Sequence, residues 1–302
     1  MKRIFLSVFI LSVLLLSVFL ASAAVVSYAA GENSPSASLP TTDVSYYADN
    51  APGIGDLEYR AERCTLDIAV PQGAAADQKL PVIVWFHGGG LSGGNKFIVR
   101  EFVEHGIIVV AVNYRLRTKA KNPDFTEDAA AAVAWTFAHI ADYGGDVKRI
   151  YVSGHSAGGY LTMMVGMAPQ YLAAYGLKNT DIAGLYPISG QATTHFNIVA
   201  DRNAQQGIPK DPKQTRDNPV VVDEFAPLYY TNQIISPIHF LCGDPAIEWP
   251  ARVEENALTA AMLKTVRGHN TVEIRSFSGC NHGSCAQPSY EYIWKSICGE
   301  KP

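Results

Sequence analysis

Short apolar runs that favour β-strands alternate along the chain with longer stretches that favour helices. Eight runs have the length and composition of strands: 44–47, 64–70, 81–86, 107–114, 150–152, 182–188, 237–241 and 272–277. Some of them, such as 107–112, are apolar at every position, which is typical of strands that helices cover on both faces. The pattern therefore predicts a largely parallel sheet within an α/β fold.

Helical patterns fall between these strands, and one later segment follows neither pattern. We expect helices at 96–105, 124–143, 156–168, 250–267 and 289–298. The alternation predicts one domain over 43–302, with a mostly parallel eight-stranded sheet and helices on both faces. The less regular segment 190–230 is expected to form a small cap or a loop insertion.

The N-terminal segment differs in composition from the rest of the chain. Lys2-Arg3 is followed by an apolar run over 4–20 and by small residues up to position 30. This order is typical of a secretory signal peptide, which predicts export to the periplasm or the extracellular space. An uncleaved membrane anchor is the alternative, because the run is nearly long enough to span a bilayer. A Ser/Pro/Ala-rich linker is expected over 31–42.

Composition narrows the classes of partner and cofactor. The 302 residues carry a net charge of −4 without a basic cluster beyond Lys2-Arg3, so we expect no nucleic-acid partner. Beyond the N-terminal segment we expect no contact with a membrane.

The five cysteines suggest disulfides rather than a metal site. They contain no Cys-x-x-Cys pair, so their spacing matches no zinc pattern. In an exported chain one or two disulfides are plausible, and a local bridge between Cys280 and Cys285, which bracket His282, is the favoured pairing.

Residues 154–158 read Gly-His-Ser-Ala-Gly and join a β-rich run to a helical pattern. The glycines allow a sharp strand-to-helix turn that exposes the hydroxyl of Ser156, the arrangement of a nucleophile elbow. A serine needs a neighbouring base to act as a nucleophile, and that base needs an acid to orient it.

The base and the acid are expected to follow Ser156 in the chain. Four histidines do so: His195, His239, His269 and His282. His282 is the predicted base, since it lies in the loop directly after the last strand. Asp244, at the end of the strand before it, is the favoured acid. Glu248 is the alternative and ranks lower, because it lies nearer the following helix, where an acid can serve only to favour the helix N-terminus. His195 could contact substrate from the 190–230 segment.

A second glycine motif lies earlier in the chain. Residues 87–90 read His-Gly-Gly-Gly at the end of a predicted strand. Backbone N–H groups in such a loop can stabilise an oxyanion. The expected donors are Gly89, Gly90 and Ala157, the residue after the predicted nucleophile.

In their order and content these motifs resemble the α/β-hydrolase superfamily, in the branch of small carboxylesterases similar to hormone-sensitive lipase and the bacterial feruloyl or acetyl esterases. The strand-end Tyr-Arg-Leu at 114–116 and the Gly-Gly-Asp lead-in at 144–146 also resemble this branch. Two positions depart from it: Ala246 stands where many relatives carry the acid, and residues 117–119 lack the common Ala-Pro-Glu. The second departure shifts the resemblance toward esterases related to kynurenine formamidase.

The resemblance implies an eight-stranded α/β-hydrolase fold and a serine hydrolase that works without metal or organic cofactor. Its implied substrates are short-chain carboxylic esters, either small molecules or acetyl and feruloyl groups on polysaccharides. An arylformamidase or amidase with the same triad is the alternative reading. A hydrolase-like binding module without activity is a third reading, which the intact Ser156, His282 and glycine motif argue against.

Overall fold

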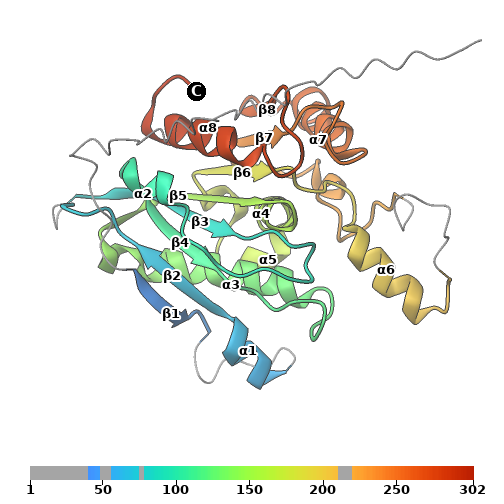
Figure 1. Ribbon diagram of the computed structural model, residues 1–302, viewed down its shortest axis with the longest axis horizontal. Coiled ribbons are helices and arrows are strands. Elements are labelled where there is room, and N and C mark those ends of the chain that lie inside the picture. Colours follow the sequence, from blue (N-terminus) through green and yellow to red (C-terminus); the bar gives the residue numbers. More distant parts are fainter. Residues whose placement is uncertain (1–39, 48–55, 75–77, 210–219) are drawn as a thin grey trace, which may run out of the picture. The chain divides into compact units, whose positions relative to one another are not determined.

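The eight predicted strands form one sheet in the order β1-β2-β4-β3-β5-β6-β7-β8 (Figure 1). The structure is a computed structural model that describes residues 40–47, 56–74, 78–209 and 220–302. The strands are β1 (Thr41–Ser45), β2 (Thr65–Ala69), β3 (Leu80–Phe86), β4 (Ile108–Val112), β5 (Gly145–His155), β6 (Gly184–Ile188), β7 (Ile238–Cys242) and β8 (Val272–Ser276). The expected signal peptide and most of the expected linker lie outside the described residues.

Strand direction confirms the predicted parallel sheet. The six strands β4, β3, β5, β6, β7 and β8 are parallel to one another, whereas at one edge β2 pairs antiparallel with both β4 and β1. Every residue of β3 and β4 is buried, as their unbroken apolar sequences predict. β3 has β4 on one side and β5 on the other, so the loops after β3 and β5 flank a point where the strand order reverses. Such a point is where open α/β sheets place ligands.

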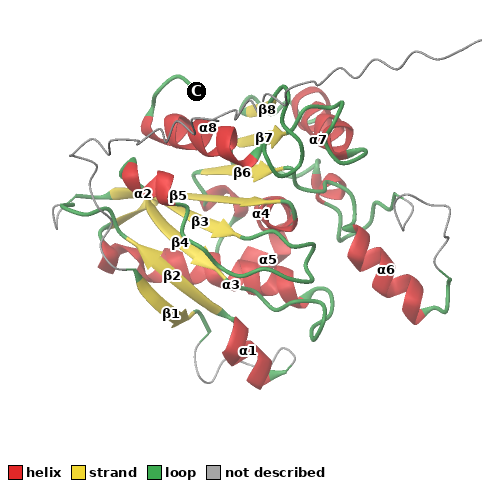
Figure 2. Cartoon of the chain, in the orientation of Figure 1, coloured by secondary structure: helices red, strands yellow, loops and turns green. Residues whose placement is uncertain are grey.

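Helices cover both faces of the sheet (Figure 2). They are α1 (Leu57–Arg63), α2 (Arg100–Glu104), α3 (Asp124–His139), α4 (Ala157–Met167), α5 (Pro169–Ala173), α6 (Phe196–Gln205), α7 (Arg252–Ala261) and α8 (Ala286–Cys298). Alternate residues of β3 face opposite layers: Val82 and Val84 join one apolar cluster with α3, α4 and α7, and Trp85 joins the other with α2 and α8. The two layers bury both faces of the central strands.

Three α-helices appear that the sequence pattern did not predict: α1, α5 and α6. α6 lies within the irregular segment 190–230. β1 begins at Thr41, two residues before the expected start of the domain. Within the described residues, no helix has the length and apolar character needed to cross a membrane.

Candidate active site

Ser156 occupies a sharp turn between β5 and α4. Its backbone has φ 58° and ψ −114°, a region that residues with a side chain rarely adopt. The turn brings α4 close to β3: a Cβ on Gly158 would lie 2.0 Å from the carbonyl oxygen of Phe86. The Ser156 N–H donates to the carbonyl of Ile188 at the end of β6, 2.8 Å away, which fixes the turn against the neighbouring strand.

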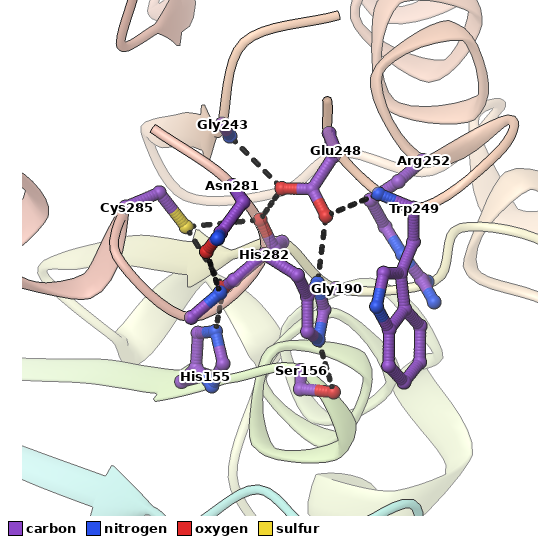
Figure 3. A network of polar contacts seen from close by, with 12 residues as sticks. His155, Ser156, Gly190, Gly243, Glu248, Trp249, Arg252, Asn281, His282 and Cys285 are labelled. Atoms are coloured by element: carbon purple, nitrogen blue, oxygen red, sulfur yellow. Dashed lines mark hydrogen bonds and ion pairs between the residues drawn. The ribbon is translucent and has the colours of Figure 1, made fainter. Parts of the chain in front are cut away.

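A chain of hydrogen bonds joins Ser156, His282 and Glu248 (Figure 3). The Nε2 of His282 lies 2.9 Å from the Oγ of Ser156, and its Nδ1 lies 2.7 Å from the Oε1 of Glu248. The carboxylate accepts from Nδ1, so Nε2 is left to accept the serine proton. The structure thus brings together two of the expected residues, Ser156 and His282, with the alternative acid.

Glu248 is held as a buried carboxylate. Its Oε2 accepts from the Ser189 hydroxyl at 2.6 Å and the Gly243 N–H at 3.0 Å, and its Oε1 accepts from the Trp249 N–H at 2.8 Å as well as from His282. Burial alone would raise the pKa of Glu248. The hydrogen bonds from His282, Ser189 and Trp249 outweigh it and lower the pKa to about 2.

The prediction that Asp244 is the acid is wrong, because the structure pairs His282 with Glu248. Asp244 does not contact His282: its Oδ1 accepts from the Ala246 N–H at 2.9 Å, and its Oδ2 accepts from the Gly279 N–H at 2.8 Å. The Gly279 and Ala246 N–H groups lower the pKa of Asp244. The Asp244 carbonyl also accepts from the Glu248 N–H at 2.8 Å, so Asp244 shapes the turn that presents Glu248.

The backbone and the ring of His282 are both held from outside the triad. The His282 carbonyl accepts from the Nε2 of His155 at 2.6 Å and from the thiol of Cys285 at 3.2 Å. Burial, with a contribution from nearby His282, lowers the pKa of His155 to about 4. The indole of Trp249 stacks on the His282 ring, with centroids 4.0 Å apart and planes 12° apart (Figure 3). These contacts limit the rotation of the imidazole.

The expected disulfide between Cys280 and Cys285 is wrong, because both cysteines are free thiols. The Cys285 sulfur lies 3.2 Å from the His282 carbonyl oxygen and 3.3 Å from the Ser189 hydroxyl, so it faces the site. Burial raises the pKa of the Cys285 thiol to about 11, so the group keeps its proton and donates.

The loop after β3, residues 87–92, lies against the serine. A Cβ placed on Gly88 would lie 3.4 Å from the Cβ of Ser156. Gly89 and Gly90 both have positive φ, 110° and 62°. Among the described residues, none supplies an acceptor in hydrogen-bonding geometry to the N–H of Gly89 or Gly90. The N–H groups of Gly89 and Gly90 are therefore free to donate to a ligand.

His195 does not offer a direct contact to a substrate, contrary to its expected role. It is 2% exposed and caps α6, with its Nδ1 accepting from the N–H of Asn197 at 3.2 Å. Its ring packs on Tyr160 and Phe196. With so little exposed surface, His195 offers almost no contact area to a bound substrate.

Sequence reasoning missed three side chains that support the site: His155, Ser189 and Trp249. His155 lies inside the serine motif, Ser189 directly follows β6 with a positive φ of 45°, and Trp249 follows Glu248. Their positions at the end of β5 and directly after β6 gave a signal for the first two. Trp249 gave none beyond its proximity to an alternative acid.

A model of the BD-FAE family matches residues 66–244, more than half of the chain. The matched segment contains Ser156 and the glycines of the loop after β3. It ends before Glu248 and His282.

Curated relatives match shorter segments. Probable carboxylic ester hydrolase LipM of Mycobacterium tuberculosis is 38% identical over 94 residues, which cover 30% of this chain and 22% of that protein. Carboxylesterase 1F of Mus musculus is 33% identical over 125 residues, covering 37% and 22%. Inactive carboxylesterase-like protein VdtD of Byssochlamys spectabilis is 29% identical over 169 residues, covering 48% and 27%. The chain thus spans about a quarter of the length of these relatives.

Solved structures share the fold over most of the chain. A truncated carbohydrate esterase from gut microbiota has a TM-score of 0.66 at 16% identity, covering 88% of this chain and 98% of that one. The thermophilic esterase Est2 of the planctomycete Thermogutta terrifontis has a TM-score of 0.62 at 20% identity, covering 86% and 91%. With the α/β-hydrolase fold that these structures share and a family match over more than half its length, the chain belongs to the BD-FAE family.

Proposed function

We propose that the protein is a serine hydrolase that cleaves carboxylic esters through an acyl-enzyme. The observation that carries the proposal is the hydrogen-bonded chain Ser156–His282–Glu248, with distances of 2.9 Å and 2.7 Å, facing a loop with free N–H groups. The carboxylesterase names of the relatives support the same reaction class.

The geometry supports a two-step mechanism. The Oγ of Ser156 attacks the ester carbonyl while the Nε2 of His282 takes its proton, and Glu248 stabilises the resulting imidazolium. The N–H groups of Gly89, Gly90 and Ala157 stabilise the oxyanion. His282 then gives its proton to the departing alcohol. Water, deprotonated by the same imidazole, attacks the acyl-enzyme and releases the acid. Every step uses side chains and backbone groups of this chain.

Short acyl groups are the proposed substrates, including acetyl or feruloyl groups on polysaccharides. Support comes from the segment 190–230, whose described part contains α6 and the short 3₁₀-helix Pro227–Tyr230, little material for a large lid. The neighbour named as a carbohydrate esterase is in line with saccharide-linked esters. Export through residues 1–30 remains part of the proposal, since it gives such an enzyme access to polysaccharides.

Hydrolysis of p-nitrophenyl acetate tests the reaction and the assignment of the acid. Ser156→Ala should lower kcat by at least about 10⁴-fold, and Glu248→Gln by about 10³- to 10⁴-fold, because the base then loses its orienting carboxylate. Asp244→Asn is the comparison variant: Asp244 does not contact His282, and asparagine keeps the backbone carbonyl that accepts from Glu248 and a side-chain oxygen for the Ala246 N–H, so kcat should fall far less than in Glu248→Gln.

Three outcomes would contradict parts of the proposal. Loss with Asp244→Asn but not with Glu248→Gln would reverse the assignment of the acid. A preference for octanoyl over acetyl esters would refute the short-acyl substrate class. A wild type that leaves p-nitrophenyl acetate intact but cleaves an N-formyl arylamine would indicate an amidase. A wild type that cleaves neither substrate would indicate a binding module.

A further inference from the structure

The loop that carries the proposed oxyanion donors has an unfavourable backbone conformation. Three successive residues, Gly89, Gly90 and Leu91, have φ of 110°, 62° and 61°. Leu91 carries a side chain and is fully buried, so its left-handed conformation is strained and persists only where contacts hold it. The groups that hold this loop therefore decide where its N–H groups point.

The first carbonyl of the loop is held by the loop itself. The Gly89 carbonyl accepts from the N–H groups of Ser92 at 3.0 Å and Gly93 at 3.1 Å. A planar trans peptide places its C=O and N–H on opposite sides. Holding the Gly89 carbonyl inside the turn therefore directs the N–H of Gly90 outward.

The next carbonyl is held by α6, which is more than 100 residues away in the chain. The Nδ2 of Asn197 donates to the Gly90 carbonyl at 2.5 Å and to the Ser92 hydroxyl at 3.4 Å. The Ser92 hydroxyl donates to the same carbonyl at 3.2 Å. Asn197 lies in the first turn of α6, where its N–H donates to the side chain of the N-cap residue His195.

A second contact from α6 reaches the same loop through Arg117. The guanidinium of Arg117 pairs with Asp201, one turn further along α6, with its Nε 2.8 Å from Oδ2. Its Nη1 donates to the Ser92 hydroxyl at 3.3 Å, and its backbone N–H donates to the Leu91 carbonyl at 2.8 Å. Arg117 thus connects α6 to the strained part of the loop.

We propose that α6 holds the oxyanion loop in its active conformation, with Asn197 as the positioning residue that fixes the Gly90 carbonyl. This inference rests on the proposed esterase function. It gives α6 a role in the rate of the chemical step.

Asn197→Asp tests the inference with little change in volume. A carboxylate cannot donate to the Gly90 carbonyl and repels its oxygen, whereas Asn197→Ala removes the donor without adding a charge. Because oxyanion donors act mainly in the transition state, both variants should lower kcat for p-nitrophenyl acetate by about 10- to 100-fold, with KM within a few-fold of wild type. Gln205→Glu is the matched control, an exposed amide-to-acid change on the same helix.

The inhibition constant (Ki) of a trifluoromethyl ketone, measured on folded enzyme, does not change through loss of stability alone. The Ser156 oxygen adds to its carbonyl carbon, the serine proton passes to His282, and the carbonyl oxygen becomes the anion that the loop binds. Its Ki should rise in proportion to the loss of kcat/KM. Circular dichroism and thermal melts identify the temperature range in which each variant is folded, and all constants are measured there.

Each result decides the inference. The inference is supported if Asn197→Asp and Asn197→Ala lower kcat/KM and raise Ki by similar factors while Gln205→Glu changes neither. Unchanged constants in both Asn197 variants overturn it, as does an increase in KM at constant kcat, which would place Asn197 in substrate binding. Failure of the proposed function is distinguished beforehand, because it would leave wild type as inactive as Ser156→Ala.

Discussion

At the level of single residues, Trp249 has a role that its exposure conceals. It is 44% exposed, yet one face of its indole stacks on the His282 ring. Such ring pairs contribute about 0.5–1.5 kcal/mol. We expect Trp249→Ala to lower kcat for p-nitrophenyl acetate by about 3- to 10-fold, because the imidazole gains rotational freedom, and Trp249→Phe to retain most of the rate.

Ile247→Ala is the control for this prediction. Ile247 is also exposed and precedes Glu248, so it tests whether any change in this loop alters the rate. Equal losses in Ile247→Ala and Trp249→Ala would mean that loop conformation, rather than stacking, holds His282.

Single residues also show where the sequence was informative about the site. Ser156 could be found because it lies in the elbow motif directly after β5, and His282 because it lies in the loop that follows the last strand. Asp244 and Glu248 could not be ranked, because only three residues of a turn separate them and the turn decides which carboxylate faces inward. Here Asp244 binds the N–H of Ala246 in its own loop and that of Gly279 in the loop after β8, whereas Glu248 binds His282.

At the level of elements, the elbow depends on how closely α4 approaches β3. A Cβ at position 158 would lie 2.0 Å from the Phe86 carbonyl oxygen, and this backbone cannot move away within the sheet. We expect Gly158→Ala to lower the free energy of unfolding by at least about 2 kcal/mol and to reduce esterase activity in the folded fraction. Urea unfolding and p-nitrophenyl acetate turnover measure the two effects.

Gly93→Ala is the matched glycine substitution. A Cβ at position 93 meets no atom within 4 Å, so stability should change by less than about 0.5 kcal/mol. Similar destabilisation by both substitutions would show that general loss of glycine, rather than contact between α4 and β3, is responsible.

The elements differ in how well they could be predicted. The central strands were predictable because burial on both faces leaves unbroken apolar runs, as in β3 and β4. α6 was not, because its sequence mixes polar and charged residues and its N-cap is His195 rather than the usual serine, threonine, aspartate or asparagine. Its position on the oxyanion loop depends on tertiary contacts of Asn197, which no local pattern indicates.

At the level of the whole molecule, buried neutral histidines should make stability depend on pH. Burial lowers the pKa of His87 and of His155 to about 4, and it also lowers the pKa of His239. In the unfolded chain these groups titrate near their ordinary value of 6.5. Between these values the unfolded state binds more protons, so the free energy of unfolding falls as pH decreases from about 6.5 to about 4.

Each such histidine adds about 1.4 kcal/mol per pH unit to this slope at most. Glu248 extends the decline to lower pH: its pKa is lowered from 4.5 to about 2, so the stabilisation it gives is present above pH 4.5 and is lost as pH falls toward 2. Urea unfolding at intervals from pH 8 to pH 4.5 should show nearly constant stability above pH 7 and a steep decline below pH 6.5.

His155→Gln separates the contribution of one histidine from the general effect of acid. Glutamine keeps a donor for the His282 carbonyl but does not titrate, so the slope between pH 6.5 and pH 4.5 should become shallower by about one proton. An identical slope in wild type and His155→Gln would mean that His155 takes up its proton in the folded state. The donor to the His282 carbonyl would then be a charged imidazolium.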